Sequence, residues 1–355
     1  MATQARRRSS RKGFDRATYE EGVQAFLAEL GEEQYRRLAD PSDLPTEAAV
    51  YARHADLFAE GPIEALRRAA DSTGEEGERN RALLAFATDG YLQRTGAALA
   101  DQIATAENRA VIHWRGEPIA YPLARDRISA TGDRAERNGL FEHWLRAVEA
   151  INPLRIARFE ALEDAVRDLG YVDRVEMVRR TRGWNPDELA AQTRGALNSS
   201  ETGYYAAMRR LLARAGIEQG DGSLADAWFG LRGIGWDAWF EPRRLPRILE
   251  TTLGALGMAL RDQPGATLDF EPRPGKAPGA SCVAVRVPGD VRVMVNPRGD
   301  WEDMSGALNV AGHLVHLASA ASDTPPSLGV LGNPSVGQGY AFLMEGLLGE
   351  PGWLA

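Results

Sequence analysis

The sequence predicts a mainly α-helical protein with one small antiparallel β-sheet, and two patterns in the residues support this fold class. Apolar residues recur three and four positions apart from residue 18 to about residue 216, as they do along the buried face of a helix. The β-branched runs come later, at 282–287 and 291–295, and Pro288-Gly289-Asp290 between them is typical of a hairpin turn. The 355 residues, 44% of them apolar, allow two domains or one large helical body.

Charge, cysteine usage and hydropathy exclude several classes of protein. The 42 Lys and Arg residues against 50 Asp and Glu residues give a net charge of −8, so we expect neither nucleic acid nor a membrane as a partner. Cys282 is the one cysteine, which excludes an intramolecular disulfide framework and any multi-cysteine metal site. No stretch approaches 18 apolar residues, and no apolar run follows the first arginines. We therefore expect a cytoplasmic protein.

The first part of the chain is expected to be a tail followed by a helical body. Residues 1–17 are rich in Arg, lack interleaved aromatic residues and are predicted to be a basic disordered tail. Residues 18–260 form the predicted helical body, in which Asn185 with Pro186 begins one helix. Ser200 is expected to begin another, with Tyr204 in the core. The predicted core stripes are 23–30, 141–148 and 156–169.

Residues 261–355 are expected to form a hairpin and two helices, packed as one unit with the helical body. The first helix is predicted at 303–320, with Asp303 or Ser305 capping its exposed N–H groups. The second is predicted at 336–348, after a Pro-rich loop. His313 and His316 lie three apart on the first helix, a spacing that places both on one face. The other histidines, His54, His113 and His143, have no spaced partners and are expected to be ordinary side chains.

Three segments of this unit carry a family resemblance. Residues 309–316 read N-V-A-G-H-L-V-H, residues 336–345 read V-G-Q-G-Y-A-F-L-M-E, and residues 273–280 read R-P-G-K-A-P-G-A. This order resembles the zinc metallopeptidases of the oligoendopeptidase F and thimet oligopeptidase family, whose first motif helix reads H-E-x-G-H-x-x-H and whose upstream segment reads R-x-x-K-x-x-G-A. The resemblance implies a zincin-type helical fold with the small sheet beside the motif helix.

Carried over residue by residue, the resemblance implies a degenerate site. The first zinc-binding His of the family falls on Asn309, the general-base Glu on Val310, and the Glu that is the third zinc ligand on Gln338. His313 keeps the second zinc-binding His, and His316 matches a residue that is not a ligand in the family. The residues implied to contact a substrate are Arg273, Lys276, His313, His316, Gln338 and Tyr340.

The chemistry of these residue types argues against zinc as a cofactor. A catalytic zinc needs three good protein ligands and a water, together with a carboxylate that accepts the proton. Neutral amide oxygens of Asn309 and Gln338 are poor zinc donors, and Val310 accepts no proton. We therefore expect no cofactor. One alternative stays open, in which His313 and His316 belong to a rebuilt metal site.

The sequence therefore predicts a catalytically inactive, metallopeptidase-like protein whose cleft binds a peptide, a small molecule or a partner chain. An enzyme with repurposed, metal-free chemistry in the same cleft is one alternative, and metallopeptidase activity through a rebuilt site or a partner chain is another. Family members continue with further helices beyond the point that matches Ala355. We accordingly expect a homo-oligomer or a partner chain to cover the C-terminal face.

Overall fold

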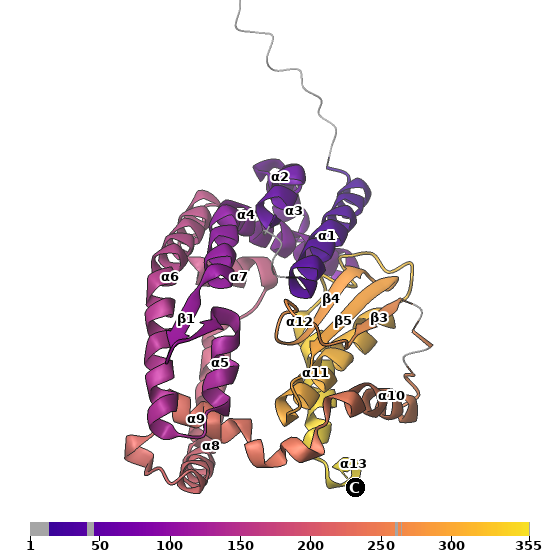
Figure 1. Cartoon of the computed structure of the whole chain (residues 1–355). Helices are drawn as coiled ribbons and strands as arrows, with labels where there is room; N and C mark the ends of the chain where they lie inside the picture. Colours follow the sequence, from indigo (N-terminus) through magenta and orange to yellow (C-terminus); the bar gives the residue numbers. More distant parts are fainter. Residues whose placement is uncertain (1–13, 41–45, 260–261, 264, 355) are drawn as a thin grey trace, which may run out of the picture.

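The computed structural model describes residues 14–40, 46–259, 262–263 and 265–354, and it shows two lobes joined by the first helix (Figure 1). The first lobe is helical, with one short hairpin, and the second builds a small sheet against two motif helices. The elements of the first lobe are α1 (Arg16–Ala39), α2 (Glu47–Arg53), η1 (Ala55–Phe58), α3 (Glu60–Ala69), α4 (Gly74–Arg109), β1 (Val111–Trp114), β2 (Glu117–Ala120), α5 (Tyr121–Ala130), α6 (Arg134–Asp168), α7 (Arg174–Arg182), α8 (Pro186–Arg214), η2 (Gln219–Asp221) and α9 (Leu224–Arg232).

The second lobe holds the segments that carry the family resemblance. Its elements are η3 (Ile234–Trp239), η4 (Pro242–Arg244), α10 (Leu245–Ala255), β3 (Ala266–Asp269), β4 (Gly279–Arg286), β5 (Asp290–Asn296), α11 (Trp301–Ala318), α12 (Pro334–Glu345), η6 (Gly346–Gly349) and α13 (Pro351–Leu354). The mainly helical fold class with a hairpin beside the motif helix is confirmed. Among the described helices, none is long and apolar enough to cross a membrane.

The start of α1 lies earlier than the predicted boundary between tail and body. Residues 1–13 of the predicted tail lie outside the described residues. Asp15 is the N-cap of α1, and its side chain accepts a hydrogen bond from Thr18 N. The helix therefore begins at Arg16, inside the segment predicted to be tail.

A hairpin lies between two helices of the first lobe, in a stretch where the sequence analysis expected a continuous helical pattern. Val111–Trp114 pairs antiparallel with Glu117–Ala120, and Arg115 (φ 50°) and Gly116 (φ 86°) make the turn between them. Trp114 fixes the hairpin to α6, because a Cβ on Gly139 would lie 2.4 Å from its ring. The prediction of continuous helix in this stretch was wrong.

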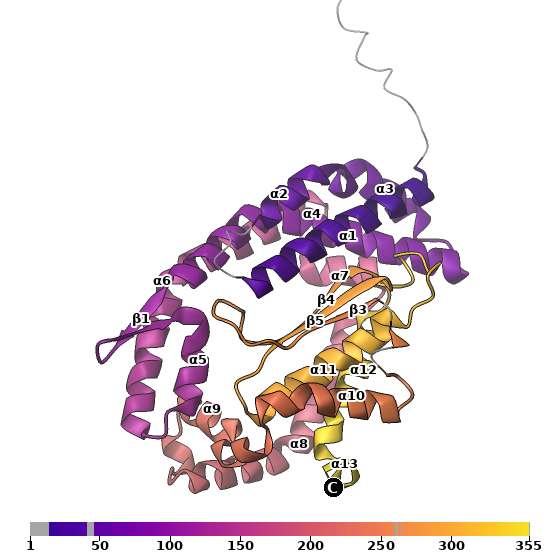
Figure 2. The same ribbon diagram turned by 45° about the vertical axis from the view of Figure 1, so that its right-hand side comes forward.

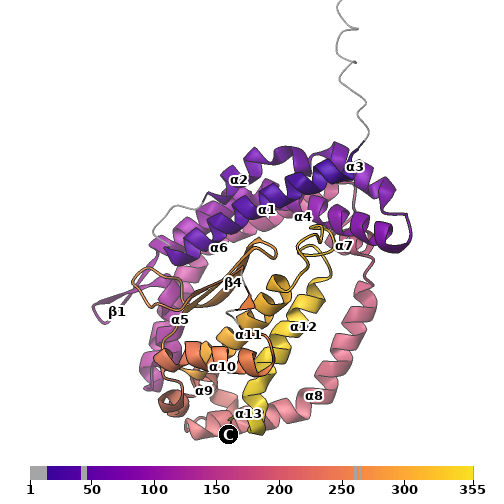
Figure 3. The ribbon, with the colours of Figure 1, turned by 90° about the vertical axis from the view of Figure 1, so that its right-hand side faces the viewer.

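Helix α8 is a single helix, and it is exposed along nearly its whole length (Figure 3). The predicted restart at Ser200 does not occur, since the helix continues through this residue and its hydroxyl donates back to Ala196 O at 2.9 Å. Tyr204, predicted to be core, is 58% exposed, and Leu197 is 62% exposed. The apolar face of α8 is therefore solvent-accessible in this chain.

The sheet of the second lobe has the strand order β3-β5-β4. Strands β4 and β5 form the predicted antiparallel hairpin, and β3 adds a third strand parallel to β5. One face of this sheet shares its hydrophobic core with α11 and with α10, which the sequence analysis had placed in the helical body. The buried residues of that core include Leu245, Leu249, Leu253, Val291, Val293, Val295, Leu308, Val310 and Leu314.

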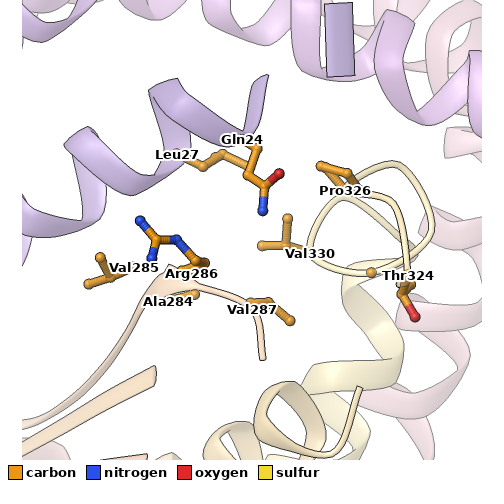
Figure 4. Close-up of a pocket in the computed structure, with 10 residues that line it drawn as sticks. Gln24, Leu27, Ala284, Val285, Arg286, Val287, Thr324, Pro326 and Val330 are labelled. Atoms are coloured by element: carbon orange, nitrogen blue, oxygen red, sulfur yellow. The ribbon is translucent and has the colours of Figure 1, made fainter. Parts of the chain in front are cut away.

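Helix α1 packs across β4 and holds the two lobes together (Figure 2). The approach is close enough that a Cβ on Gly31 would lie 2.8 Å from Ala284 O, and only glycine avoids that overlap. Arg292 of β5 donates to both carboxylate oxygens of Glu32 at 2.9 and 2.6 Å and lies over the Tyr35 ring. Beyond the end of β4, α1 and the loop 319–333 leave a cavity of only about 30 Å³, on which Gln24 and Val330 converge (Figure 4).

Candidate functional site

Helices α11 and α12 cross with their backbones in contact, and this crossing builds the candidate site. Asp300 caps α11 and Asp303 returns the bond in a capping box, so the helix begins two residues before the predicted start. A Cβ on Gly312 would lie 2.4 Å from Tyr340 O and 2.6 Å from Ala341 Cα. Glycine at this position therefore lets α12 approach the face of α11 that carries the two histidines.

The crossing brings together His313, His316 and Tyr340, three of the residues that the resemblance implies contact a substrate. A Cβ on Gly337 would lie 3.6 Å from His313 Nδ1 and 3.3 Å from His316 Cδ2, so the start of α12 lies directly against both imidazoles. The His316 ring stacks on the Tyr340 ring, with centroids 5.2 Å apart and planes 22° apart. Gln338 follows Gly337 and is half-buried. We call Asn309, His313, His316, Gln338 and Tyr340 the α11–α12 face.

Burial sets the charge state of His313. Burial lowers the pKa of the His313 imidazole, and the neighbouring His316 lowers it further. His313 is therefore neutral at pH 7 and offers one N–H donor and one nitrogen acceptor. A neutral imidazole of this kind can accept a proton or hold a polar ligand.

Glu345 completes the site and was not among the predicted site residues. Its Oε2 accepts a hydrogen bond from Asn309 Nδ2 at 2.9 Å, and its Oε1 accepts one from Ser305 Oγ at 2.7 Å. One carboxylate of α12 thus fixes two side chains of α11. The signal available in the sequence was a lone acidic residue within an apolar helix, seven positions after Gln338.

Val310 directly follows Asn309 on α11 and is buried. It is 6% exposed and belongs to the core that α11 shares with the sheet. The position that the resemblance assigns to the general base is therefore filled by an apolar side chain in apolar surroundings. A carboxylate at this position would lose its hydration, which costs free energy.

The donor set at the α11–α12 face does not fit a catalytic zinc. The amide nitrogen of Asn309 is bonded to Glu345, which leaves a neutral oxygen, a weak zinc donor, as its remaining polar atom. His313 and His316 supply imidazoles, yet nowhere in the described part of the chain do three or more His, Cys, Asp and Glu side chains gather in a way that could hold a metal ion. No reaction step is therefore assigned to a metal here.

Lys276, predicted to contact substrate, instead holds the strands together. It is 4% exposed, and its Nζ lies within 3.0 Å of four oxygens, namely Asp269 O, Asp269 Oδ1, Glu271 O and Val295 O. Three N–H groups facing four acceptors leave none for a ligand. Lys276 thus ties β3 to β5 in this structure.

Arg273, the other basic residue of the predicted substrate set, contacts the same carboxylate. It donates to both oxygens of Asp269 at 2.9 and 2.8 Å. Burial alone would raise the pKa of Asp269, but the hydrogen bonds from Arg273 and Lys276 outweigh burial and lower it to about 2. The segment resembling R-x-x-K-x-x-G-A therefore forms an ion cluster at the junction of the strands.

Comparison with known proteins places this arrangement among solved structures. No protein-family model matches the sequence, and no curated protein matches it. A structure assigned as oligoendopeptidase F from Bacillus anthracis str. Ames is similar over 85% of this chain, with 16% identity and a TM-score of 0.56. A second oligoendopeptidase F structure is similar over 87% (17% identity, TM-score 0.55), and PZ peptidase A with an inhibitor over 96% (15% identity, TM-score 0.61).

The chain therefore has the fold of the zinc metallopeptidases that the motif segments resemble, and the predicted resemblance is confirmed at the level of the fold. The similar structures are, in particular, oligoendopeptidase F and PZ peptidase A. This chain spans 60% of the length of the two oligoendopeptidase F structures and 68% of PZ peptidase A. At this level of identity the similarity shows the fold alone, and any activity has to be argued from the residues of the site.

Proposed function

We propose that this chain is an oligoendopeptidase-fold protein that binds a peptide or a small molecule at the α11–α12 face and does not hydrolyse it with zinc. The observation that carries the proposal is the bond between Asn309 and Glu345, 2.9 Å long, at the position where the resemblance expects the first zinc-binding His. The side chain at this position is engaged in holding two helices together. Val310, at the position of the general base, is buried in the core.

The remaining groups of the face suit binding. His313 is neutral at pH 7, because its pKa is lowered by burial and by His316. The imidazoles, the amide of Gln338 and the phenol of Tyr340 can each donate and accept hydrogen bonds, as peptide groups require. Tyr340 is 43% exposed, so a ligand can reach this face from solvent.

Binding and hydrolysis can be measured in one experiment. Labelled peptides titrated with the purified chain are expected to show saturable binding that a metal chelator leaves unchanged, with no release of new amino termini. Tyr340→Ala is expected to weaken binding, whereas Phe342→Ala, at an exposed position of α12 that points away from Tyr340, is the matched control. Peptide hydrolysis that a chelator abolishes would overturn the proposal.

A second candidate function rests on the state of His313. A neutral, half-buried imidazole beside polar side chains is suited to metal-free acid–base catalysis. On this account a substrate found by screening is converted in the presence of a chelator, and His313→Ala abolishes turnover. Unchanged turnover in that variant would exclude His313 as the catalytic group.

We also propose a cytoplasmic location. Cys282 is the one cysteine of the sequence, and burial raises the pKa of its thiol to about 12. Such a thiol is unreactive and suits a reducing compartment, where disulfides do not contribute to stability. Localisation of a tagged chain by fractionation tests this.

A further inference from the structure

A cavity of about 450 Å³ opens beside His316, at the C-terminal end of α11. Its walls come from α11, from Tyr340 of α12, from the end of β4 and from the loop 319–333. The volume falls in the range of about 300–1,000 Å³ that is typical of small-molecule sites. Asn309, His313 and Gln338, the three positions that the resemblance assigns to zinc ligands, are not part of these walls, whereas His316 is.

The lining of the cavity combines apolar side chains with hydroxyl groups. Met258, Val287 and Leu328 contribute apolar surface, while Ser319 and Thr324 contribute hydroxyl groups. Among the described residues that line the cavity, there is no Asp, Glu, Lys or Arg. A charged ligand would lose its hydration here without gaining a counter-ion, so the lining favours a neutral one.

His316 and Tyr340 bring a stacked pair of rings to the lining of the cavity. Their rings are stacked at 5.2 Å, and both residues line the cavity. Close packing fixes this pair, because a Cβ on Gly337 would lie 3.3 Å from His316 Cδ2 and a Cβ on Gly312 would lie 2.4 Å from Tyr340 O. Aromatic rings gain from offset stacking on such a pair beyond the burial of apolar area.

The geometry points to an uncharged aromatic group with a hydrogen-bonding substituent, such as a phenol or an indole, as the occupant of this cavity. The ring would pack on the stacked pair of His316 and Tyr340, and the substituent would reach Ser319 or Thr324. The inference rests on the proposed binding function, because His316 and Tyr340 belong both to the cavity and to the α11–α12 face. The same group can arrive as a free small molecule or as the side chain of Tyr or Trp in a peptide.

Calorimetric titration of the purified chain with indole, p-cresol and benzoate tests the ligand class. Indole and p-cresol are expected to bind with dissociation constants on the order of 1 mM, as befits ligands of this size, and benzoate at least about tenfold more weakly. Ala320→Trp fills the cavity and is expected to weaken indole binding at least about tenfold. Ala321→Trp, at the next and exposed position outside the cavity lining, is the matched control and should bind as the unmodified chain does.

Two results would overturn the inference, namely benzoate binding as tightly as indole, or indole binding that Ala320→Trp leaves unchanged. Should Ala320→Trp fail to fold, Leu328→Trp obstructs the same cavity from the loop. A capped peptide with one central Trp distinguishes the two sources. Binding at least about tenfold tighter than that of indole identifies a peptide side chain, and equal binding identifies a free small molecule, both in accord with the inference.

The same set of ligands separates this inference from the proposed function. A peptide without aromatic residues that binds while indole does not would refute the aromatic cavity and leave peptide binding intact. Chelator-sensitive hydrolysis together with indole binding that Ala320→Trp abolishes would refute the proposed function and leave the cavity intact.

Discussion

The junction of the strands around Lys276 and the α11–α12 face both carry the family resemblance, and they differ in what has been retained. At the junction, Lys276 and Arg273 engage Asp269 and backbone oxygens through short hydrogen bonds. At the α11–α12 face, Asn309 and Val310 occupy the positions where the resemblance implies a zinc ligand and a base. On the proposed function, the interactions that build the fold are present in this chain, while the groups that the chemistry of zinc requires are not.

The largest expected effect on the free energy of unfolding comes from a substitution at the junction of the strands. Lys276→Met removes a buried ammonium, so three backbone carbonyl groups lose this donor and Asp269 keeps only Arg273 as its cationic partner. Breaking a buried pair from one side costs about 3–5 kcal/mol, so the free energy of unfolding measured in urea should fall by that amount. Arg273→Met, whose side chain is 37% exposed, is the control and should cost about 1 kcal/mol or less. Equal effects of the two variants would contradict a structural role specific to Lys276.

The second prediction asks whether the scaffold can regain a zinc site. Asn309→His with Gln338→Glu restores two ligands beside His313, and Glu345 is placed to accept the other ring N–H of a His at 309. Saturating zinc should then stabilise the double variant by about 2–3 kcal/mol and the unmodified chain by none, measured by thermal unfolding. Val310 is left unchanged because a carboxylate there would be buried in the core. Absence of any zinc-dependent stabilisation would mean that these positions do not correspond to zinc ligands.

Removing the hydrogen bond between Asn309 and Glu345 is expected to lower the free energy of unfolding by less than Lys276→Met does. Asn309→Ala leaves Ser305 as the remaining donor to the carboxylate, and loss of a hydrogen bond to a charged group costs about 1.5–3 kcal/mol. Urea unfolding of this variant measures the cost. Glu345→Gln removes the charge at the same contact and should cost a similar amount. No change in either variant would show that this contact does not hold α11 to α12.

His313 gives the α11–α12 face a defined pH dependence. Its pKa in the folded chain lies below that of an unfolded His, about 6.5, so the unfolded state binds the proton more readily. The free energy of unfolding should therefore fall as the pH drops from about 6.5 through the folded pKa. NMR titration of the His313 ring measures this pKa, and His316→Gln should raise it only in part, since burial remains. A His313 pKa at or above 6.5 would contradict the burial seen here.

The smallest effect on stability is expected on α8, which contrasts with α11. Leu197→Ser changes an exposed side chain and should alter the free energy of unfolding by about 0.5 kcal/mol or less. Self-association through α8, a different surface from the C-terminal face that is predicted to be covered, can be tested with the same variant. Light scattering on the unmodified chain should then show an assembly larger than one chain, reduced by Leu197→Ser. A monomer in both cases would contradict self-association through α8.

The sequence predicts the second lobe well because its signals are local. The helix α11, expected at 303–320, occupies 301–318, and the β4–β5 hairpin lies where its turn residues indicate. The missed hairpin β1–β2 had a signal of the same kind, since Arg115-Gly116 follows a run of β-branched and aromatic residues.

The sequence could not show the surroundings of residues whose environment depends on contacts between distant parts of the chain. Lys276 meets Val295, nineteen residues away, and Asn309 meets Glu345 on another helix. Tyr204 lies in a helical pattern that resembles a core face, yet no neighbouring element covers it. Periodicity identifies which face of a helix is apolar, but only tertiary packing determines whether that face is buried.

The central claim is that the zinc chemistry is absent while the scaffold is kept, and elemental analysis of the purified, untagged chain after incubation with zinc tests it most directly. The account predicts far less than stoichiometric zinc after removal of free metal, with His313→Ala indistinguishable from the unmodified chain. Stoichiometric zinc that His313→Ala abolishes would contradict the account and make a working metallopeptidase the better description of this protein.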